Sequence, residues 1–190
     1  VSLSASGCGY NTLTTKQQNV KAKWANVETQ LQRRSDLLNN LIETAKMAGV
    51  QEQEGFGKIA EARSRLLNAT SQAPQGEAGD KTPEQKQAVI DAANSFGGTV
   101  GRLLVLQEAY PQLQTNANFR DLQQQLESTE NRINIARQDY NEAVQSYNTT
   151  IRTFPNAIGA KIFYGAKPKV PFEAVTPNAQ VAPSVNFNTQ

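Results

Sequence analysis

Apolar residues recur every three or four positions along most of this chain, the spacing that places them on one face of an α-helix. The clearest run indicates one long helix over residues 119–154, with Asn118 as its N-cap and Pro155 as its end. Its apolar face consists of Phe119, Leu122, Leu126, Ile133, Ala136, Tyr140, Val144, Tyr147, Ile151 and Phe154. The other face is rich in glutamine and asparagine, so we expect it to be solvated.

Two more helices are predicted nearer the start of the chain, over residues 12–49 and 56–67. The pattern leaves open whether these are separate helices or one bent rod. Glycine, proline and alanine replace the periodic apolar residues over residues 72–81, which predicts a loop between helices.

A further helix is predicted to begin at Thr82, with Pro83 in its first turn and Gln85 completing a capping box, and to end at Pro111. Four amphipathic helices cannot bury their apolar faces singly, and mostly short connections favour antiparallel neighbours. We therefore predict an all-α fold, an antiparallel up-and-down four-helix bundle with long helices and a C-terminal proline-rich extended tail.

The chain divides into three predicted parts. Residues 1–10 form an N-terminal lipobox or membrane-anchor segment, residues 11–163 form the bundle, and residues 164–190 form the extended tail. Repeated prolines exclude a long helix from the tail. The side chain of Phe172 or Phe187 is its natural anchor, in a groove of its own bundle or of a neighbouring subunit.

One charged residue interrupts the apolar face of the first helix. Arg34 stands where an apolar residue is due, and a buried guanidinium must be paired or reach water. We expect Arg34 to meet a carboxylate, with Glu130 and Asp36 as the candidates. The alternative is a side chain that extends outward from a widened bundle, and the pattern does not choose between the two.

Cys8 is the single cysteine of the chain, and small residues precede it. This context resembles the end of a bacterial lipoprotein signal, in which the cysteine is lipidated. Two alternatives stay open: residues 1–9 are the end of an uncleaved membrane helix, or Cys8 is a free thiol in a disordered terminus. A lipidated Cys8 or an uncleaved membrane helix would each place the following domain at a membrane, on the periplasmic or other extracytoplasmic face of the bacterial envelope.

Composition argues against most catalytic classes. The chain has 190 residues, no histidine and one cysteine, so imidazole-dependent nucleophiles and zinc sites with histidine or several thiolates are excluded. We predict that the protein is not an enzyme and needs no cofactor or metal. The net charge of +2 is dispersed along the chain, so nucleic acid is not an expected partner.

Two blocks of residues carry a resemblance to a known family. The first block is Gly9-Tyr10-Asn11, Val20, Trp24-Ala25, Gln30-Leu31, Arg33-Arg34 and Asp36-Leu37-Leu38-Asn39-Asn40-Leu41. The second is Glu108-Ala109-Tyr110-Pro111, Phe119, Leu122, Leu126, Glu130-Asn131-Arg132-Ile133, Ala136-Arg137, Tyr140-Asn141, Val144, Tyr147-Asn148, Ile151 and Phe154-Pro155. Together they resemble the LemA family of bacterial envelope proteins. The resemblance implies a membrane-anchored helical bundle without an established enzymatic activity.

These features favour a non-enzymatic envelope protein that acts as a scaffold or assembly module through its helix faces and its tail. It would be anchored by lipidated Cys8 or an N-terminal helix, and would associate with itself or with an envelope protein. The alternative is a carrier or sensor that binds a small apolar ligand or a peptide between the helices, with Trp24, Tyr140 and Tyr147 lining the site.

The polar residues shared with the family have two interpretations. They form a buried ion-pair layer that fixes helix register, which we favour, or a surface that docks a partner. The residues are Arg33, Arg34, Asp36, Glu130, Asn131 and Arg137.

Overall fold

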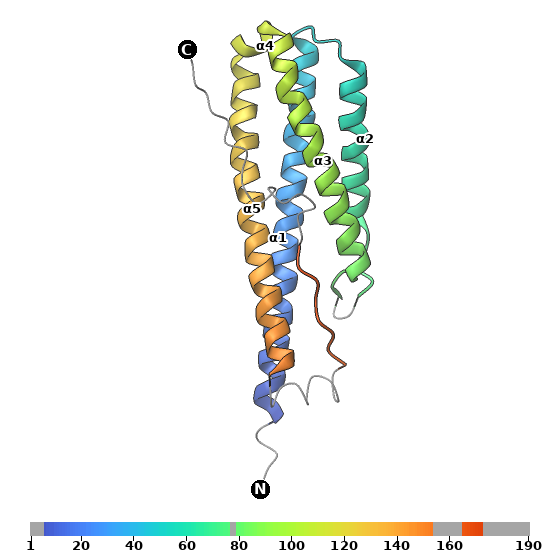
Figure 1. The fold of residues 1–190 in the computed structure, drawn as a ribbon, viewed down its shortest axis with the longest axis vertical. Coiled ribbons are helices and arrows are strands. Elements are labelled where there is room, and N and C mark those ends of the chain that lie inside the picture. Colours follow the sequence, from blue (N-terminus) through green and yellow to red (C-terminus); the bar gives the residue numbers. More distant parts are fainter. Residues whose placement is uncertain (1–5, 77–78, 154–164, 173–190) are drawn as a thin grey trace.

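The computed structural model describes residues 6–76, 79–153 and 165–172, and within these ranges the regular secondary structure is entirely helical (Figure 1). The predicted all-α class is therefore confirmed for this part of the chain. The helices are α1 (Ser6–Met47), α2 (Gln53–Ser71), α3 (Pro83–Ala109), α4 (Pro111–Thr115) and α5 (Ala117–Arg152). The first two predicted helices are separate, and α1 continues without a break through the predicted domain boundary at residue 10.

The four long helices alternate in direction along the chain, and short α4 turns the chain from α3 into α5 (Figure 1). α1 packs against α5, and α2 packs against α3 to form the α2–α3 hairpin. With 42 and 36 residues, α1 and α5 are longer than α2 and α3, with 19 and 27. The α1–α5 pair therefore projects beyond the α2–α3 hairpin, at the end of the molecule where α1 begins.

Local sequence explains where α1 ends. Gly49 adopts a φ of +88°, which favours glycine, and its N–H donates to the Lys46 carbonyl at 3.0 Å. The N–H of Val50 reaches back to the Ala45 carbonyl at 3.1 Å, which completes a Schellman motif. Val50 and Ala45 are both buried, so this turn also contributes to the core.

The starts of α3 and α5 are capped by side chains. The predicted capping box is present, since Thr82 accepts from the Gln85 N–H and the Gln85 side chain accepts from the Thr82 N–H. The predicted N-cap of α5 was wrong by two residues. Asn116 caps this helix by accepting from the Phe119 N–H at 3.0 Å, and Asn118 lies within the first turn. The predicted helix end at Phe154 and Pro155 lies outside the described residues.

The core is continuous through the helices, and in α5 it is built from predicted apolar positions. α1 contributes Val20, Trp24, Val27, Leu31 and Leu38, and α5 contributes Phe119, Leu126, Ile133, Tyr140, Val144 and Tyr147, all of them buried. Ile59, Leu66, Val89 and Phe96 extend the core into the α2–α3 hairpin. The cluster also includes Phe172, a residue beyond the helices.

Residues 165–172, here called the docked segment, run without regular secondary structure beside α1 and α5, where the α2–α3 hairpin does not cover them (Figure 1). Gly165 begins the segment with a φ of +55°. Phe172 is 4% exposed, as expected for one of the two predicted anchors. The other, Phe187, lies outside the described residues.

Candidate functional site

Two asparagines of α5 hold the main chain of the docked segment. Asn148 donates from Nδ2 to the Lys169 carbonyl at 2.8 Å, and its Oδ1 accepts from the Lys169 N–H at 2.8 Å. Asn141 makes the same pair of bonds to Phe172, at 3.1 Å to the carbonyl and 2.7 Å from the N–H. Each carboxamide thus satisfies both main-chain groups of one residue, as a neighbouring β-strand would.

The spacing of these contacts follows from the geometry of the two partners. Asn141 and Asn148 are seven residues apart, which is about 10.5 Å along a helix axis. Lys169 and Phe172 are three residues apart, which is about 9 to 10 Å in an extended chain. A proline precedes each of them, and Pro168 and Pro171 have no N–H that would need a partner.

A tyrosine adds a bond between the two asparagine contacts. The hydroxyl of Tyr140 donates to the Val170 carbonyl at 3.1 Å. Burial, together with the negative charge of Asp80, raises the pKa of Tyr140 far above its ordinary value, so the hydroxyl stays protonated and keeps its role as donor. The Val170 side chain is 47% exposed, so the contact with this residue goes through its main chain.

The side chains of Lys169 and Phe172 instead contact residues of the bundle. Phe172 packs on Trp24, with ring centroids 6.4 Å apart, and the Arg137 guanidinium lies 4.1 Å from the centre of the Phe172 ring. Lys169 places its ammonium 5.5 Å from the centre of the Tyr147 ring and 2.9 Å from Asp80 Oδ2. We call the residues that contact the docked segment the receiving surface; they are Trp24, Asp80, Arg137, Tyr140, Asn141, Tyr147 and Asn148.

Asp80, just before α3, is the charged centre of the receiving surface. Its Oδ2 lies 2.9 Å from both the Lys86 and the Lys169 ammonium groups, and it is 4% exposed. Burial alone would raise the pKa of Asp80, but the hydrogen bonds from Lys169 and Lys86 outweigh it and hold the pKa below its ordinary value. Burial also lowers the pKa of Lys86, against the opposing effect of Asp80.

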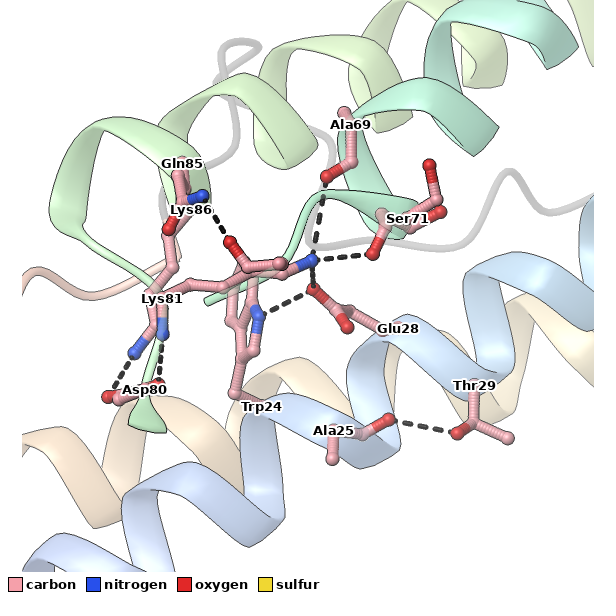
Figure 2. A network of polar contacts seen from close by, with 12 residues as sticks. Trp24, Ala25, Glu28, Thr29, Ala69, Ser71, Asp80, Lys81, Gln85 and Lys86 are labelled. Atoms are coloured by element: carbon pink, nitrogen blue, oxygen red, sulfur yellow. Dashed lines mark hydrogen bonds and ion pairs between the residues drawn. The ribbon is translucent and has the colours of Figure 1, made fainter. Parts of the chain in front are cut away.

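Lys86 and its neighbours join α3 to α1 and α5. Its ammonium lies 5.4 Å from the Trp24 ring centre and 5.6 Å from that of Tyr140, while the two rings are 5.1 Å apart. Figure 2 shows how Glu28 stands between the Trp24 indole and the Lys81 ammonium. The same Glu28 oxygen accepts from the indole N–H at 2.8 Å and from Lys81 at 2.6 Å.

The predicted polar layer is brought together in part. Arg34 is 5% exposed and places Nη1 3.3 Å from both carboxylate oxygens of Glu130, and its Nη2 donates to the Ala93 carbonyl at 2.8 Å. Asp36 does not join them, because its side chain is 58% exposed and its nearest cation is Arg63, at 3.8 Å.

Arg137 connects this layer to the docked segment. Burial and the nearby charge of Arg34 lower the pKa of Arg137, and Glu130 opposes the shift. The Arg137 guanidinium also lies over the Phe172 ring, as described above. The predicted polar layer therefore lies next to Phe172, the last residue of the docked segment.

Comparison with known proteins identifies the family. The model of the LemA family matches residues 23–187. The chain belongs to the LemA family. The matched range contains both the receiving surface and the docked segment, so both lie within the LemA homology.

Three curated relatives are magnetosome proteins. MamQ 1 and MamQ 2 of Paramagnetospirillum magneticum are each 29% identical to this LemA protein over 158 residues, and MamQ of Magnetospirillum gryphiswaldense is 27% identical over 158 residues. Each match covers 77% of the chain and 58% of the relative, so the chain spans little more than half the length of these relatives.

The aromatic residues suggested for a carrier function are part of the LemA core. Trp24, Tyr140 and Tyr147 are 3%, 0% and 3% exposed, and the ring of Phe172 packs beside Trp24. A surface pocket of about 540 Å³ lies elsewhere, between α1 and α2, and polar residues such as Glu28, Gln32 and Asn68 contribute to its lining.

Two properties of the described residues bear on membrane and metal binding. None of the helices there is both long and apolar enough to cross a bilayer. The same residues contain no group of three or more histidine, cysteine, aspartate or glutamate side chains placed to hold a metal ion. Cys8 lies in the first turn of α1, but its side chain is outside the described part, so its lipidation stays a prediction.

Sequence reasoning missed the role of Asn141 and Asn148. The available signal was the Tyr-Asn pair, which occurs at 140–141 and again at 147–148. In each pair the tyrosine is buried and the asparagine is half-buried at the edge of the core. A polar residue repeated at that edge is placed to bind a chain that lies along the helix.

Proposed function

We propose that this LemA protein is a non-enzymatic, membrane-anchored scaffold of the bacterial envelope, in which an up-and-down four-helix bundle makes its contacts through helix faces and the C-terminal tail. The observation that carries the proposal is the docked segment. Its main chain is bound by Asn141 and Asn148, and the Phe172 side chain is buried in the core. A fold that binds an extended chain in this way already has the machinery of an interaction module.

The membrane part of the proposal rests on the chain start and on the family. Cys8 stands in a context typical of lipidated cysteines, and it lies at the free end of the α1–α5 pair. An anchor there would leave the α2–α3 hairpin and the receiving surface farther from the bilayer. The relatives named as magnetosome proteins support association with a membrane, which we propose is on the extracytoplasmic side of the envelope.

Crosslinking in intact cells tests this function. The full chain with an epitope tag is expressed in a bacterium, treated with a short bifunctional crosslinker, and separated into membrane and soluble fractions. We expect the chain in the membrane fraction and in discrete crosslinked species of fixed stoichiometry, identified by mass spectrometry. A chain found in the soluble fraction, or only as uncrosslinked monomer in the membrane, would overturn the scaffold proposal.

A further inference from the structure

We propose that the receiving surface also binds the docked segment of a second copy, so that two chains exchange residues 165–172. The inference rests on the proposed scaffold function and names its partner and its site. The occupant is a segment with the pattern Pro-Lys-Val-Pro-Phe, residues 168–172.

The first argument is that recognition goes mainly through the main chain. The Lys169 and Phe172 peptide groups each give and receive one hydrogen bond, and the Val170 carbonyl accepts a third contact from Tyr140. These bonds depend on the extended path of the segment and on the three-residue interval between its contacts. Any chain with this path and with prolines at the two unpaired positions satisfies them equally well.

The second argument is side-chain complementarity at both ends of this interval. Asp80 and the Tyr147 ring receive the positive charge of Lys169, and Trp24 and Arg137 receive the Phe172 ring. A lysine and an aromatic residue three positions apart are therefore both required. The segment of another copy has both, so charge and shape match without any adjustment.

The third argument is that part of the surface is held by contacts that do not involve the segment. Asp80 forms an ion pair with Lys86, and Lys86 lies over the Trp24 and Tyr140 rings. Three helices fix these groups, so little ordering is needed when a segment binds. A preorganised surface binds an incoming peptide with a smaller entropic cost.

The fourth argument concerns the connection to the bundle. The docked segment begins at Gly165, whose positive φ of +55° marks a turn and whose missing side chain leaves open space around it. Glycines of this kind absorb the backbone change when a segment moves from one partner to another. Each copy carries one segment and one receiving surface, so reciprocal exchange closes as a two-fold dimer with no site left empty.

Mixing two full-length variants tests the exchange. Asn141→Ala with Asn148→Ala impairs the receiving surface and leaves the segment intact. Lys169→Ala with Phe172→Ala impairs the segment and leaves the surface intact. Each variant alone lacks either the asparagine hydrogen bonds or the side-chain contacts of Lys169 and Phe172, whereas the mixture pairs the intact segment of the first with the intact surface of the second. Native mass spectrometry and sedimentation of the equimolar mixture are expected to show a 1:1 heterodimer at a concentration at least tenfold below that needed for either variant alone.

Matched controls keep the result specific. Gln138→Ala with Gln145→Ala changes two exposed α5 residues at the same seven-residue interval, and Lys167→Ala removes an exposed charge from the segment. A mixture of these two controls is expected to behave like the wild-type chain. If circular dichroism shows that the double asparagine variant has lost its helices, Asn148→Asp replaces it, because aspartate keeps the size and loses the donor.

The outcomes separate this inference from the scaffold function. A mixture that remains monomeric at every concentration tested overturns segment exchange. The same holds if a synthetic peptide of residues 165–172 binds the segment-impaired variant while the two chains do not associate, since the surface would then take up the segment only within one chain. In both cases crosslinked species in the envelope would still support the scaffold function, whereas their absence with a positive mixing result would overturn the scaffold and leave the exchange standing.

Discussion

Asn141 and Asn148 do at the residue scale what an adjacent strand does in a sheet. A carboxamide carries both a donor and an acceptor, so one side chain satisfies both the N–H and the C=O of a single residue. Other side chains of similar size could pack at these positions, but few could satisfy both the N–H and the C=O of one residue. The two positions therefore have a stronger chemical requirement than the exposed glutamines around them.

Replacing Asn148 by alanine is expected to release the Lys169 end of the docked segment. Two hydrogen bonds are lost, each contributing about 0.5 to 1.5 kcal/mol. Hydrogen exchange at the Lys169 amide should accelerate by at least tenfold, while amides in the middle of α3 keep their protection. Gln145→Ala, which changes an exposed residue one turn away, is the control. Unchanged exchange at Lys169 in the Asn148 variant would contradict the assignment.

Asp80 makes stability depend on pH in the acid range. Its folded-state pKa is depressed by its two lysine partners, so it contributes stability that is complete above its ordinary value of 3.8 and is lost as the pH falls below it. The free energy of unfolding, measured with urea, should therefore fall less steeply between pH 4 and pH 2.5 in Asp80→Asn than in the wild-type chain. Asp121→Asn, which removes an exposed carboxylate, is the control. Parallel curves for all three proteins would refute the effect.

At the scale of elements, polar contacts decide how the α2–α3 hairpin sits on the α1–α5 pair. Arg34 of α1 reaches Glu130 of α5 and a carbonyl of α3, while Lys81 and Lys86 connect the start of α3 to α1. Apolar faces alone permit helices to slide past one another. Charges that meet at one register do not, which is why we propose that the Arg34 layer specifies the alignment.

The layer can be tested by removing Arg34. Arg34→Ala leaves a cavity and an unpaired Glu130, and is expected to lower the free energy of unfolding by about 2 to 4 kcal/mol. Arg34→Met fills the space without a charge and should cost less than about 1 kcal/mol, because Glu130 is 34% exposed and can be hydrated. Asp36→Ala should change stability by no more than about 0.5 kcal/mol. A loss below about 1 kcal/mol in Arg34→Ala would argue against the layer.

The glycines of α3 should be replaceable. Gly98 and Gly101 are exposed, and a methyl group at either position would meet no atom within 4 Å. Because glycine is less favourable than alanine inside a helix, Gly98→Ala and Gly101→Ala are each expected to raise stability by about 0.5 to 1 kcal/mol in urea unfolding. Gly49→Ala should lower it instead, because the φ of +88° is strained for alanine. Destabilisation by the α3 changes would contradict the open space around these two glycines.

How far the elements could be predicted depends on the range of the interactions involved. The three-and-four spacing and the Thr82 capping box are local, and both appeared where expected. The cap of α5 was misplaced because Asn116 and Asn118 are equally good caps, and only the path of the chain after α4 selects the first. Pairing of Arg34 with Glu130 could be foreseen as one of two options, because a buried charge needs a partner.

The receiving surface could not be predicted in the same way. It joins residues of α1, the start of α3, α5 and the docked segment, which only the tertiary fold brings together. Asp80 gave no local signal, since it lies in a stretch that the sequence marks only as a loop. The repeated Tyr-Asn pair was visible in the sequence. Its role could not be inferred, because nothing in the sequence showed that residues 169 and 172 would lie beside the two asparagines.

For the whole molecule, the projecting α1–α5 pair separates the chain start from the rest of the fold. Trp24 contacts the first turns of α3, so residues 6–23 of α1 extend roughly 27 Å past this contact at 1.5 Å per residue. The docked segment covers part of this projection. An anchored chain would present its hairpin away from the bilayer, with its segment between the hairpin and the membrane.

The proposed anchor predicts a simple change in fractionation. Cys8→Ser removes the only thiol that could be lipidated, so the full-length protein should move from the membrane to the soluble fraction, and its intact mass should lose the diacylglyceryl group. Ser6→Ala, which leaves the cysteine in place, is the control. A Cys8→Ser protein that remains in the membrane fraction would favour the uncleaved helix as the anchor.

The seven-residue interval from Asn141 to Asn148 and the three-residue interval from Lys169 to Phe172 also constrain how the chain can change in length. One extra residue between Asn141 and Asn148 would swing the second asparagine by about 100° around the α5 axis, off the segment entirely. Compensation needs seven added residues in the helix together with three added between Lys169 and Phe172. Insertions and deletions should therefore be rare in both stretches among proteins that keep this contact, and where they occur they should come in matched pairs of seven and three.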